Sequence, residues 1–317
     1  MSIRLYRSLD EAAGEFGPCA LTIGNFDGVH AGHRKILAEV AAMARARDWK
    51  AGVLTFDPHP AAVVAPERAP KLMTTPEERC ALMGEAGIGE ALILPFTAEV
   101  ARLKPEEFAR QILAEKLRAR LVLVGDNFRF GAKAAGDTAT LKALGAELGF
   151  EARTVPAVRR RGMIVSSSGI RKLIHHGKIY LAGRLLERPH YLEGQIVAGQ
   201  GIGSRKTVPT LNVAAEREVI PADGVYVTRA SDDAGRRWRA VTNIGNRPTF
   251  GGQTRTIETF LLDGLEGETP RWLRVEFLHR LRDERKFPSP EALREQILGD
   301  VGRAQKWFRR TERLGEK

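Results

Sequence analysis

The sequence predicts a doubly wound α/β domain followed by an antiparallel β-barrel domain with a C-terminal helix. Three observations lead to this prediction. The chain has 317 residues, which is more than one domain usually holds. Short apolar runs alternate with helical patterns from residue 20 to about residue 155, whereas alternating apolar and polar residues prevail from about residue 190. We therefore expect one domain over residues 1–186 and a second over residues 187–317.

The first half contains four apolar runs of strand length that end at Gly, Pro or Asp: residues 20–23, 51–56, 91–95 and 121–124. Helical patterns separate and follow them, at residues 34–47, 76–86, 105–117 and 138–148. Thr75 is the predicted N-cap of the second helix, because Pro76 follows it at the first turn. Such alternation is typical of a parallel sheet covered on both faces, which binds its ligands at the carboxyl ends of the strands.

The second half contains segments in which apolar and polar residues alternate: residues 190–197, 224–230, 237–243, 254–262 and 272–280. Short strands at this spacing indicate an antiparallel barrel or sandwich. Pro290 begins a helix whose apolar stripe consists of Leu293, Ile297, Val301, Ala304 and Phe308. Residues 170–186, which are helical and basic, are predicted to connect the two halves.

The composition indicates a globular protein with a basic surface. Lys and Arg number 50 against 39 Asp and Glu, and the net charge of +11 suits nucleotides, nucleic acid or an anionic membrane surface. A solvated basic surface without a partner explains the same excess. Cys19 and Cys80 are too few for a disulfide framework and fit a reducing compartment. Because we find neither a signal peptide nor an apolar run of ~20 residues, we expect a cytoplasmic protein without a membrane partner.

The first candidate site follows the first predicted strand. Residues 24–33 form a glycine-rich loop that leads into a helix, and its backbone N–H groups and positive helix end suit a bulky anion. His30 and His33 share one face of the first helical turn, where two imidazoles can donate to phosphate oxygens during phosphoryl transfer. Helix capping or burial explains the same histidines. A metal site is disfavoured, because no third ligand lies nearby in the sequence.

Three further segments follow predicted strands or begin a helix. Residues 55–60, taken alone, indicate an ordinary turn. In residues 125–131, two phenylalanines could flank a flat ring while Asp126 and Arg129 make polar contacts, although a hairpin-like turn with buried Phe explains them equally. Residues 165–171 place hydroxyls and an arginine at a helix start, which suits phosphate but is partly explained by serine capping.

Together these four segments resemble the nucleotidyltransferase domain of the bacterial bifunctional riboflavin kinase/FMN adenylyltransferase family, also called FAD synthetase. The family pattern Gly-x-Phe-Asp-Gly-x-His-x-Gly-His is complete here, whereas Asp57, Asn127 and Ser168 replace the family's Glu, Asp and Thr. The resemblance implies that His30 and His33 are catalytic. It implies contacts to ATP phosphates from Gly24, Asn25, Phe26, Asp27, Gly28, Gly32, Ser166, Ser167 and Arg171. It implies flavin contacts from Asp126, Asn127, Phe128 and Arg129.

The second half has its own glycine-rich, basic segment at residues 199–212. Loop amides with Arg205 or Lys206 can hold phosphates, and the Thr210 hydroxyl and Asn212 amide oxygen can ligate magnesium. Glu258 is an isolated carboxylate among apolar neighbours on a predicted strand. It is either a general base whose pKa burial raises or a satisfied edge residue.

Both features resemble the riboflavin kinase module of the same family, which is an antiparallel barrel. The resemblance implies that Thr210 and Asn212 hold Mg²⁺ and that Glu258 is the catalytic base. It also implies phosphate contacts from Gly203, Arg205 and Lys206, and a flavin contact from Arg282. The chain departs from the family pattern at residues 204 and 206–208, where Arg, Leu, Gly and Phe are usual.

From both resemblances we expect a two-step synthesis of FAD. Riboflavin is phosphorylated with ATP to FMN, and FMN is then adenylylated to FAD with release of pyrophosphate. The implied cofactor is Mg²⁺, and the expected partners are the small molecules ATP, riboflavin, FMN and FAD rather than nucleic acid. Two alternatives stay open: an FMN adenylyltransferase with an inactive kinase barrel, and a basic nucleic-acid-binding or regulatory protein on a degenerate scaffold. The sequence also leaves open whether the chain forms a homo-oligomer.

Overall fold

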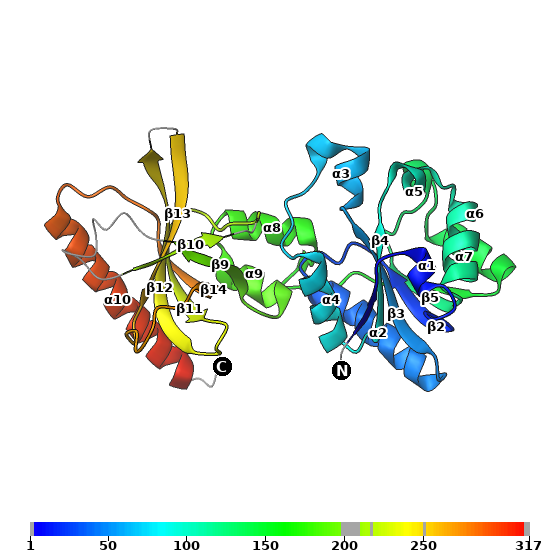
Figure 1. The fold of residues 1–317 in the computed structure, drawn as a ribbon, viewed down its shortest axis with the longest axis horizontal. Helices are drawn as coiled ribbons and strands as arrows, with labels where there is room; N and C mark the ends of the chain where they lie inside the picture. Colours follow the sequence, from blue (N-terminus) through cyan, green and yellow to red (C-terminus); the bar gives the residue numbers. More distant parts are fainter. Residues whose placement is uncertain (1–2, 198–209, 216–217, 250–251, 314–317) are drawn as a thin grey trace. The chain divides into compact units, whose positions relative to one another are not determined.

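The computed structural model describes residues 3–197, 210–215, 218–249 and 252–313 (Figure 1). Gly203, Arg205 and Lys206, which we predict to contact phosphates, lie outside the described residues. The chain divides into two compact units, Met1–Ser167 and Ser168–Lys317. The first is a parallel sheet with helices, and the second contains a closed antiparallel barrel and a C-terminal helix, so the predicted fold class is confirmed.

The sheet of the first unit contains the four predicted strands, β2 (Cys19–Ile23), β3 (Lys50–Asp57), β4 (Glu90–Pro95) and β5 (Ala119–Gly125). Two further strands lie at its edges, β1 (Arg4–Tyr6) and β6 (Glu151–Val155). The prediction missed them because exposed polar side chains on short edge strands weaken the apolar signal. All neighbours pair in parallel in the order β1-β4-β3-β2-β5-β6. The loops after β3, β2 and β5 therefore meet at one edge of the sheet.

Helices cover both faces of this sheet (Figure 1). Leu21 and Ala20 belong to different apolar cores, as strand alternation requires. The core that contains Ala20 lies under α2 (Ala31–Ala46) and α4 (Pro76–Glu85). The other lies under α1 (Leu9–Ala12), the π-helix η2 (Phe108–Lys116) and α7 (Thr138–Leu148). The smaller elements are α3 (Pro60–Val64), η1 (Pro66–Arg68), α5 (Ala98–Arg102), α6 (Pro105–Glu107), η3 (Ala132–Ala134), β7 (Arg159–Arg160) and β8 (Met163–Ile164).

The start of α4 confirms the predicted cap. The Thr75 hydroxyl accepts a hydrogen bond from the Glu78 N–H at 3.2 Å, and the Glu78 carboxylate accepts one from the Thr75 N–H at 2.9 Å. This reciprocal pair satisfies two backbone donors at the helix start. It also fixes the start of α4 directly after residues 73–74, which contact the candidate site described below.

The basic connector consists of two helices, α8 (Ser167–His175) and α9 (Ile179–Leu186). Gly177 separates them with a φ of +69°, and a Cβ there would lie 2.7 Å from the Arg280 Nε, so glycine is needed on two grounds. Because α9 packs against the barrel strands β9 (His190–Val197) and β14 (Trp272–Arg282), the second unit begins earlier than residue 187. The boundary between the two catalytic domains stays a prediction.

The barrel closes in the order β10-β13-β12-β11-β14-β9. Its other strands are β10 (Leu211–Ala215), β11 (Gly224–Ser231), β12 (Arg237–Thr249) and β13 (Gly252–Leu261). The prediction missed β10, which is short and directly follows the glycine-rich segment. Tyr226, Thr228 and Phe277 are fully or almost fully buried and fill the barrel. Alternate residues therefore face outward, toward the helix and the candidate site.

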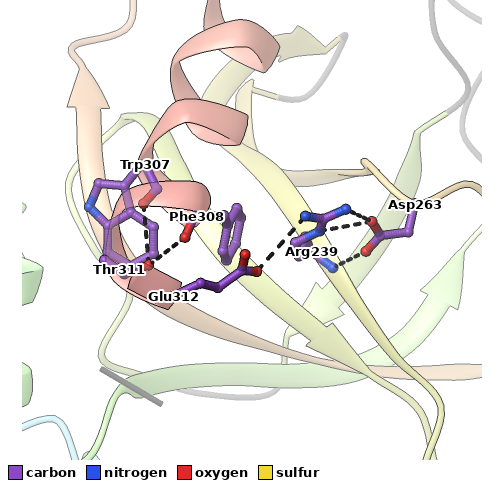
Figure 2. A network of polar contacts seen from close by, with 6 residues as sticks. All are labelled: Arg239, Asp263, Trp307, Phe308, Thr311 and Glu312. Carbon is purple, nitrogen blue, oxygen red and sulfur yellow. Dashed lines mark hydrogen bonds and ion pairs between the residues drawn. The ribbon is translucent and has the colours of Figure 1, made fainter. Parts of the chain in front are cut away.

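The C-terminal helix α10 (Pro290–Arg313) packs against the outside of the barrel. Ala304 and Phe308 of the predicted stripe are buried, whereas Leu293 is exposed. Figure 2 shows the polar contacts at the end of this helix, where the Arg239 guanidinium lies between Asp263 and Glu312. The Arg239 Nε and Nη2 both donate to the Asp263 Oδ1, at 2.8 and 2.6 Å. These contacts hold the last turn of α10 over β12.

Asp300 is the buried anchor of α10. Its carboxylate accepts hydrogen bonds from the Arg282 Nε at 2.9 Å and the Gln296 Nε2 at 2.9 Å, and it also pairs with Arg303. The substitution Asp300→Ala should lower the free energy of unfolding by about 3 kcal/mol, because it leaves the largely buried Arg282 without its carboxylate. Denaturant titration followed by tryptophan fluorescence measures this change.

The matched control is Glu312→Ala, which removes an exposed ion pair on the same helix. We expect a loss below about 1 kcal/mol for that variant. Equal losses for the two variants would contradict the anchoring role of Asp300.

Candidate functional site

The loop after β2 folds tightly between the strand and α2. Phe26, Gly28 and Val29 all have a positive φ, of 48°, 80° and 37°. Phe26 and Val29 are nonetheless buried, and the Phe26 ring lies where a Cβ on Gly24 would approach it to 3.2 Å. A strained main chain that side-chain packing holds in place is typical of functional loops. The loop presents its backbone at the start of α2, as the anion-binding prediction requires.

The Asp27 side chain anchors this loop from the protein interior. Its Oδ1 accepts hydrogen bonds from the Met73 N–H at 2.9 Å, from the Thr74 N–H at 3.1 Å and from the Thr74 hydroxyl at 3.1 Å. The Thr74 hydroxyl in turn accepts a bond from the Gly28 N–H at 3.0 Å. The buried carboxylate of Asp27 therefore shapes the loop, and the predicted phosphate contact of this residue stays a prediction.

His30 is the N-cap of α2, and its Nδ1 accepts a hydrogen bond from the His33 N–H at 3.3 Å. In a neutral imidazole this bond places the proton on Nε2, which is then a donor. The helix-capping and phosphate-binding interpretations of His30 are thus compatible. The His30 and His33 rings stack with centroids 3.6 Å apart, so the predicted pair is brought together.

Burial lowers the pKa of His33 well below its ordinary value, and the neighbouring His30 and the Arg79 cation lower it further. The ring is therefore neutral at pH 7. Its Nδ1 is buried and makes no hydrogen bond within the part of the chain that the structure describes.

The depressed pKa of His33 predicts a pH-dependent stability of the first unit. Because the unfolded chain binds a proton near pH 6.5 and the folded chain does not, stability is full above that pH and falls below it. In His33→Gln, the loss of unfolding free energy between pH 7.5 and pH 5.5 should be about 1 kcal/mol smaller than in the wild type. Denaturant titrations at both pH values measure it, and an unchanged pH dependence would contradict a buried neutral His33.

Asn25 is held from two sides. Its carbonyl accepts hydrogen bonds from the Arg79 Nη1 at 2.6 Å and the Thr55 hydroxyl at 3.4 Å. Its side-chain amide lies 3.0 Å from the His59 Nε2. The His59 Nδ1 accepts a bond from the Ala61 N–H at 3.1 Å and so caps α3. Residues 55–60, which by themselves indicate a turn, therefore reach the site.

Sequence reasoning missed three residues of this site, His59, Thr74 and Arg79. His59 lies in a segment that we noted, but its partner could not be inferred without the strand order. Thr74 directly precedes the predicted cap Thr75, and nothing in the sequence distinguishes it. Arg79 sits on a polar-looking helix, where an arginine normally indicates a solvent-exposed face.

Ser167 joins the segment after β6 to the same loop, since its hydroxyl donates to the Asp27 carbonyl at 2.9 Å. Ser166 is partly exposed beside it. Gly32 belongs here as well, because a Cβ on it would lie 3.1 Å from the His30 ring and 3.7 Å from the Val165 carbonyl. Arg171 lies on α8, which belongs to the second unit, and its Nη2 is 3.5 Å from the Ser168 hydroxyl.

The predicted flavin segment follows β5, the strand next to β2. Asp126, Asn127 and Arg129 are exposed, and Phe128 stacks on Phe130 with centroids 5.5 Å apart. Phe130 itself is buried in the core, so the buried-turn alternative is right for this ring. The Phe128 ring, only partly buried, is the one that can cover a ligand.

The second candidate site lies on the outer face of the barrel. Glu258 on β13 is the register partner of Asn212 on β10 and of Asn243 on β12. Its chain neighbours Ile257 and Thr259 are buried, so strand alternation turns Glu258 outward. Thr210 is exposed immediately before β10. The structure thus brings together the predicted base and one predicted magnesium ligand, and it adds Asn243.

Charges of both signs surround this part of the barrel. Burial raises the pKa of Glu284, and the carboxylates of Asp223 and Glu258 raise it further. Asp223 pairs with the Arg255 guanidinium at 2.7 Å. Arg282 is committed to Asp300 and lies 5.6 Å from the Phe287 ring centroid, so its flavin contact stays a prediction.

A cavity of about 370 Å³ is lined by Gln195, Val213, Ala214, Ala215, Ile220, Arg255 and Ile257. Strand alternation puts Ile257 on the opposite face of β13 from Glu258, so this cavity does not open at the Asn212–Glu258 pair. Among the described residues, no three His, Cys, Asp or Glu side chains gather to hold a metal ion. A cation beside Asn212 and Glu258 would be coordinated by hydroxyl and amide oxygens of the chain together with oxygens of a ligand. Within the described ranges, no helix has the length and apolar character to cross a membrane.

Comparison with known proteins supports two distinct modules. A family model described as FAD synthetase matches residues 13–169, and one described as riboflavin kinase matches residues 186–308. A protein of Escherichia coli (strain K12) named bifunctional riboflavin kinase/FMN adenylyltransferase is 34% identical over 96% of this chain and 97% of its own length. A protein of Pseudomonas fluorescens with the same name is 36% identical over the same shares.

A solved structure titled as a macrolide-efflux protein from Streptococcus pneumoniae has a TM-score of 0.86 and 26% sequence identity. The match covers 97% of this chain and all of that one. The likeness shows that the two proteins share their fold along nearly the whole chain.

Proposed function

The chain belongs to the bifunctional riboflavin kinase/FMN adenylyltransferase family, and we propose on this basis which residues of each module carry its activity. The protein is a transferase that converts riboflavin to FMN and FMN to FAD. One observation supports the assignment of residues to the two activities: each matched region contains its own cluster of polar residues. The loop with His30 and His33 lies in residues 13–169, and the Asn212–Glu258 pair lies in residues 186–308.

In the barrel, Glu258 is the general base of the kinase step. It accepts the proton of the terminal ribityl hydroxyl as that oxygen forms a bond to the γ-phosphorus of ATP. The bond from the γ-phosphorus to the bridging oxygen breaks, and ADP leaves with the electron pair. Asn212 and Asn243, one on either side in the strand register, orient the carboxylate.

The oxygen donors at this site suit Mg²⁺, which prefers hard oxygen ligands. Thr210 offers a hydroxyl and Asn212 an amide oxygen, on the strand that pairs with Glu258. Bound Mg²⁺ would neutralise charge on the ATP phosphates. The contacts of Gly203, Arg205 and Lys206 to those phosphates are part of the same proposal.

In the first unit, an ionised phosphate oxygen of FMN attacks the α-phosphorus of ATP. A new P–O bond forms, the bond to the β-phosphate bridging oxygen breaks, and pyrophosphate leaves. The nucleophile is already anionic and needs no base, so catalysis depends on positioning and on charge stabilisation. His30 Nε2, the loop amides, Asn25 and His33 would bind the phosphates, and Ser166 and Ser167 would add donors. The phosphate contact of Arg171, which lies in the second unit, stays a prediction.

The exposed end of β5 is the proposed flavin site of this step. The Phe128 ring would cover the isoalloxazine, while Asp126, Asn127 and Arg129 make polar contacts. Both reactions use small molecules that are found in the cytoplasm, and the two cysteines are free and buried, which agrees with a reducing compartment. The basic net charge then serves polyphosphate substrates rather than nucleic acid.

Isotope labelling of ATP tests this division. With riboflavin and γ-³²P-labelled ATP, the label should enter FMN and persist in FAD. With α-³²P-labelled ATP, it should enter FAD alone. Label from the γ position that never enters FMN would contradict the kinase assignment, and α label absent from FAD would contradict the adenylyltransferase assignment.

A further inference from the structure

Arg79 is a buried cation directly behind the loop of the first unit. Its side chain is on α4, and the residue is 1% exposed. Its Nη1 donates to the Asn25 carbonyl at 2.6 Å and to the Thr55 hydroxyl at 3.4 Å, and both acceptors are uncharged. Within the described part of the chain, Arg79 forms no ion pair with a carboxylate, and its buried Nε makes no hydrogen bond.

A buried charge without a partner is destabilising by several kcal/mol, so its presence beside a ligand-binding loop needs a reason. The carboxylate of Asp27 does not neutralise Arg79 by direct contact, because it is committed to Met73 and Thr74. The two charges interact only at longer range. An anion bound in the loop would complete the charge balance.

Arg79 and His59 together determine how Asn25 faces that anion. Arg79 fixes the carbonyl, whereas His59 contacts the side-chain amide. Because the His59 Nδ1 accepts the Ala61 N–H, a neutral ring carries its proton on Nε2. The Asn25 Nδ2 lies 3.0 Å from that nitrogen, so exchanging the oxygen and nitrogen of the Asn25 amide gives His59 an acceptor and turns Nδ2 toward the anion.

We propose that Arg79 is a positioning residue for adenylyl transfer, which orients Asn25 and places a permanent positive charge behind the loop that binds the triphosphate of ATP. The inference rests on the function proposed for the first unit. Arg79 does not touch the substrate. It acts through Asn25 and through the electrostatic potential of its positive charge. Its charge should therefore matter more than its hydrogen bonds.

The test compares full-length Arg79→Lys, Arg79→Gln and Arg79→Met. Lysine keeps the charge and can replace Nη1 at the Asn25 carbonyl, glutamine keeps a donor without charge, and methionine keeps neither. With FMN and ATP supplied, kcat for FAD formation should fall by about 10²-fold in the Gln and Met variants and by less than about tenfold in the Lys variant. KM for ATP should rise in both neutral variants, whereas KM for FMN should change by less than about threefold.

Two controls separate this role from a structural one. Arg110→Gln removes an exposed arginine of the same unit, which pairs with Glu147 at 2.7 Å, and should leave both reactions unchanged. FMN formation from riboflavin by the barrel should continue in every variant. The Met variant is expected to fold, because replacing a buried charge by an apolar side chain of similar size is often neutral or stabilising.

Equal rates of FAD formation in the Lys and Gln variants, or a wild-type rate in the Gln variant, would overturn the role of the Arg79 charge while leaving the proposed function intact. A wild-type chain that makes no FAD from FMN would overturn the proposed function and the role of Arg79 with it.

Discussion

His30→Ala should reduce the rate of FAD formation from FMN by ~10²–10³, while FMN formation from riboflavin continues at its normal rate. The reason is the tautomer that a neutral His30 ring adopts when its Nδ1 caps α2. His30 Nδ1 accepts the His33 N–H, so Nε2 carries the proton and is a donor for a phosphate oxygen. Chromatographic separation of FMN and FAD, with each flavin supplied in turn, measures both rates.

His30→Asn is the matched variant, because asparagine is a good N-cap but has no imidazole. If His30 only caps α2, His30→Asn should keep the wild-type rate; our account expects it to lose nearly as much activity as His30→Ala. His176→Ala, which replaces an exposed histidine directly after α8, should have no effect. Full adenylyl transfer by His30→Asn would reduce His30 to a structural residue.

Glu258→Gln should lower the rate of FMN formation by ~10²–10⁴, since glutamine keeps the shape and a hydrogen bond but cannot accept the hydroxyl proton. The strand register places Glu258 between Asn212 and Asn243, so the substitution changes little else. Conversion of added FMN to FAD should remain near normal, because that chemistry belongs to the first unit.

Glu276→Gln, on a strand of the barrel that does not pair with β13, is the control for loss of a carboxylate. Glu276 lies on β14, and among the described residues its ion pair is a long one with Arg229, at 3.9 Å, so this variant should keep both activities. Unchanged FMN production by Glu258→Gln would remove Glu258 from the mechanism.

Local signals in the sequence were enough to predict the central elements of the fold. Buried strands such as β2, whose residues are all buried, give uninterrupted apolar runs, and the Thr75 cap can be recognised from three residues. The loop from Gly24 to His33 was recognisable for the same reason, since all its residues are contiguous. The edge strands β1 and β6 and the short β10 lacked such runs and were missed.

Features that depend on tertiary structure could not be predicted in this way. The contact of His59 with Asn25 follows from β3 lying next to β2, and the flanking of Glu258 by Asn243 follows from the barrel register. Arg79 looks like a surface residue until α4 is packed on the sheet. The sequence offered two phenylalanines that could flank a flat ring, but Phe130 is buried in the hydrophobic core.

The most direct test of the account is the incubation of the full-length protein with riboflavin, ATP and Mg²⁺, with FMN and FAD resolved chromatographically over time. The account predicts that FMN appears first and that FAD follows as FMN accumulates. Absence of both products would contradict it, and FAD made only when FMN is supplied would show that the barrel lacks kinase activity.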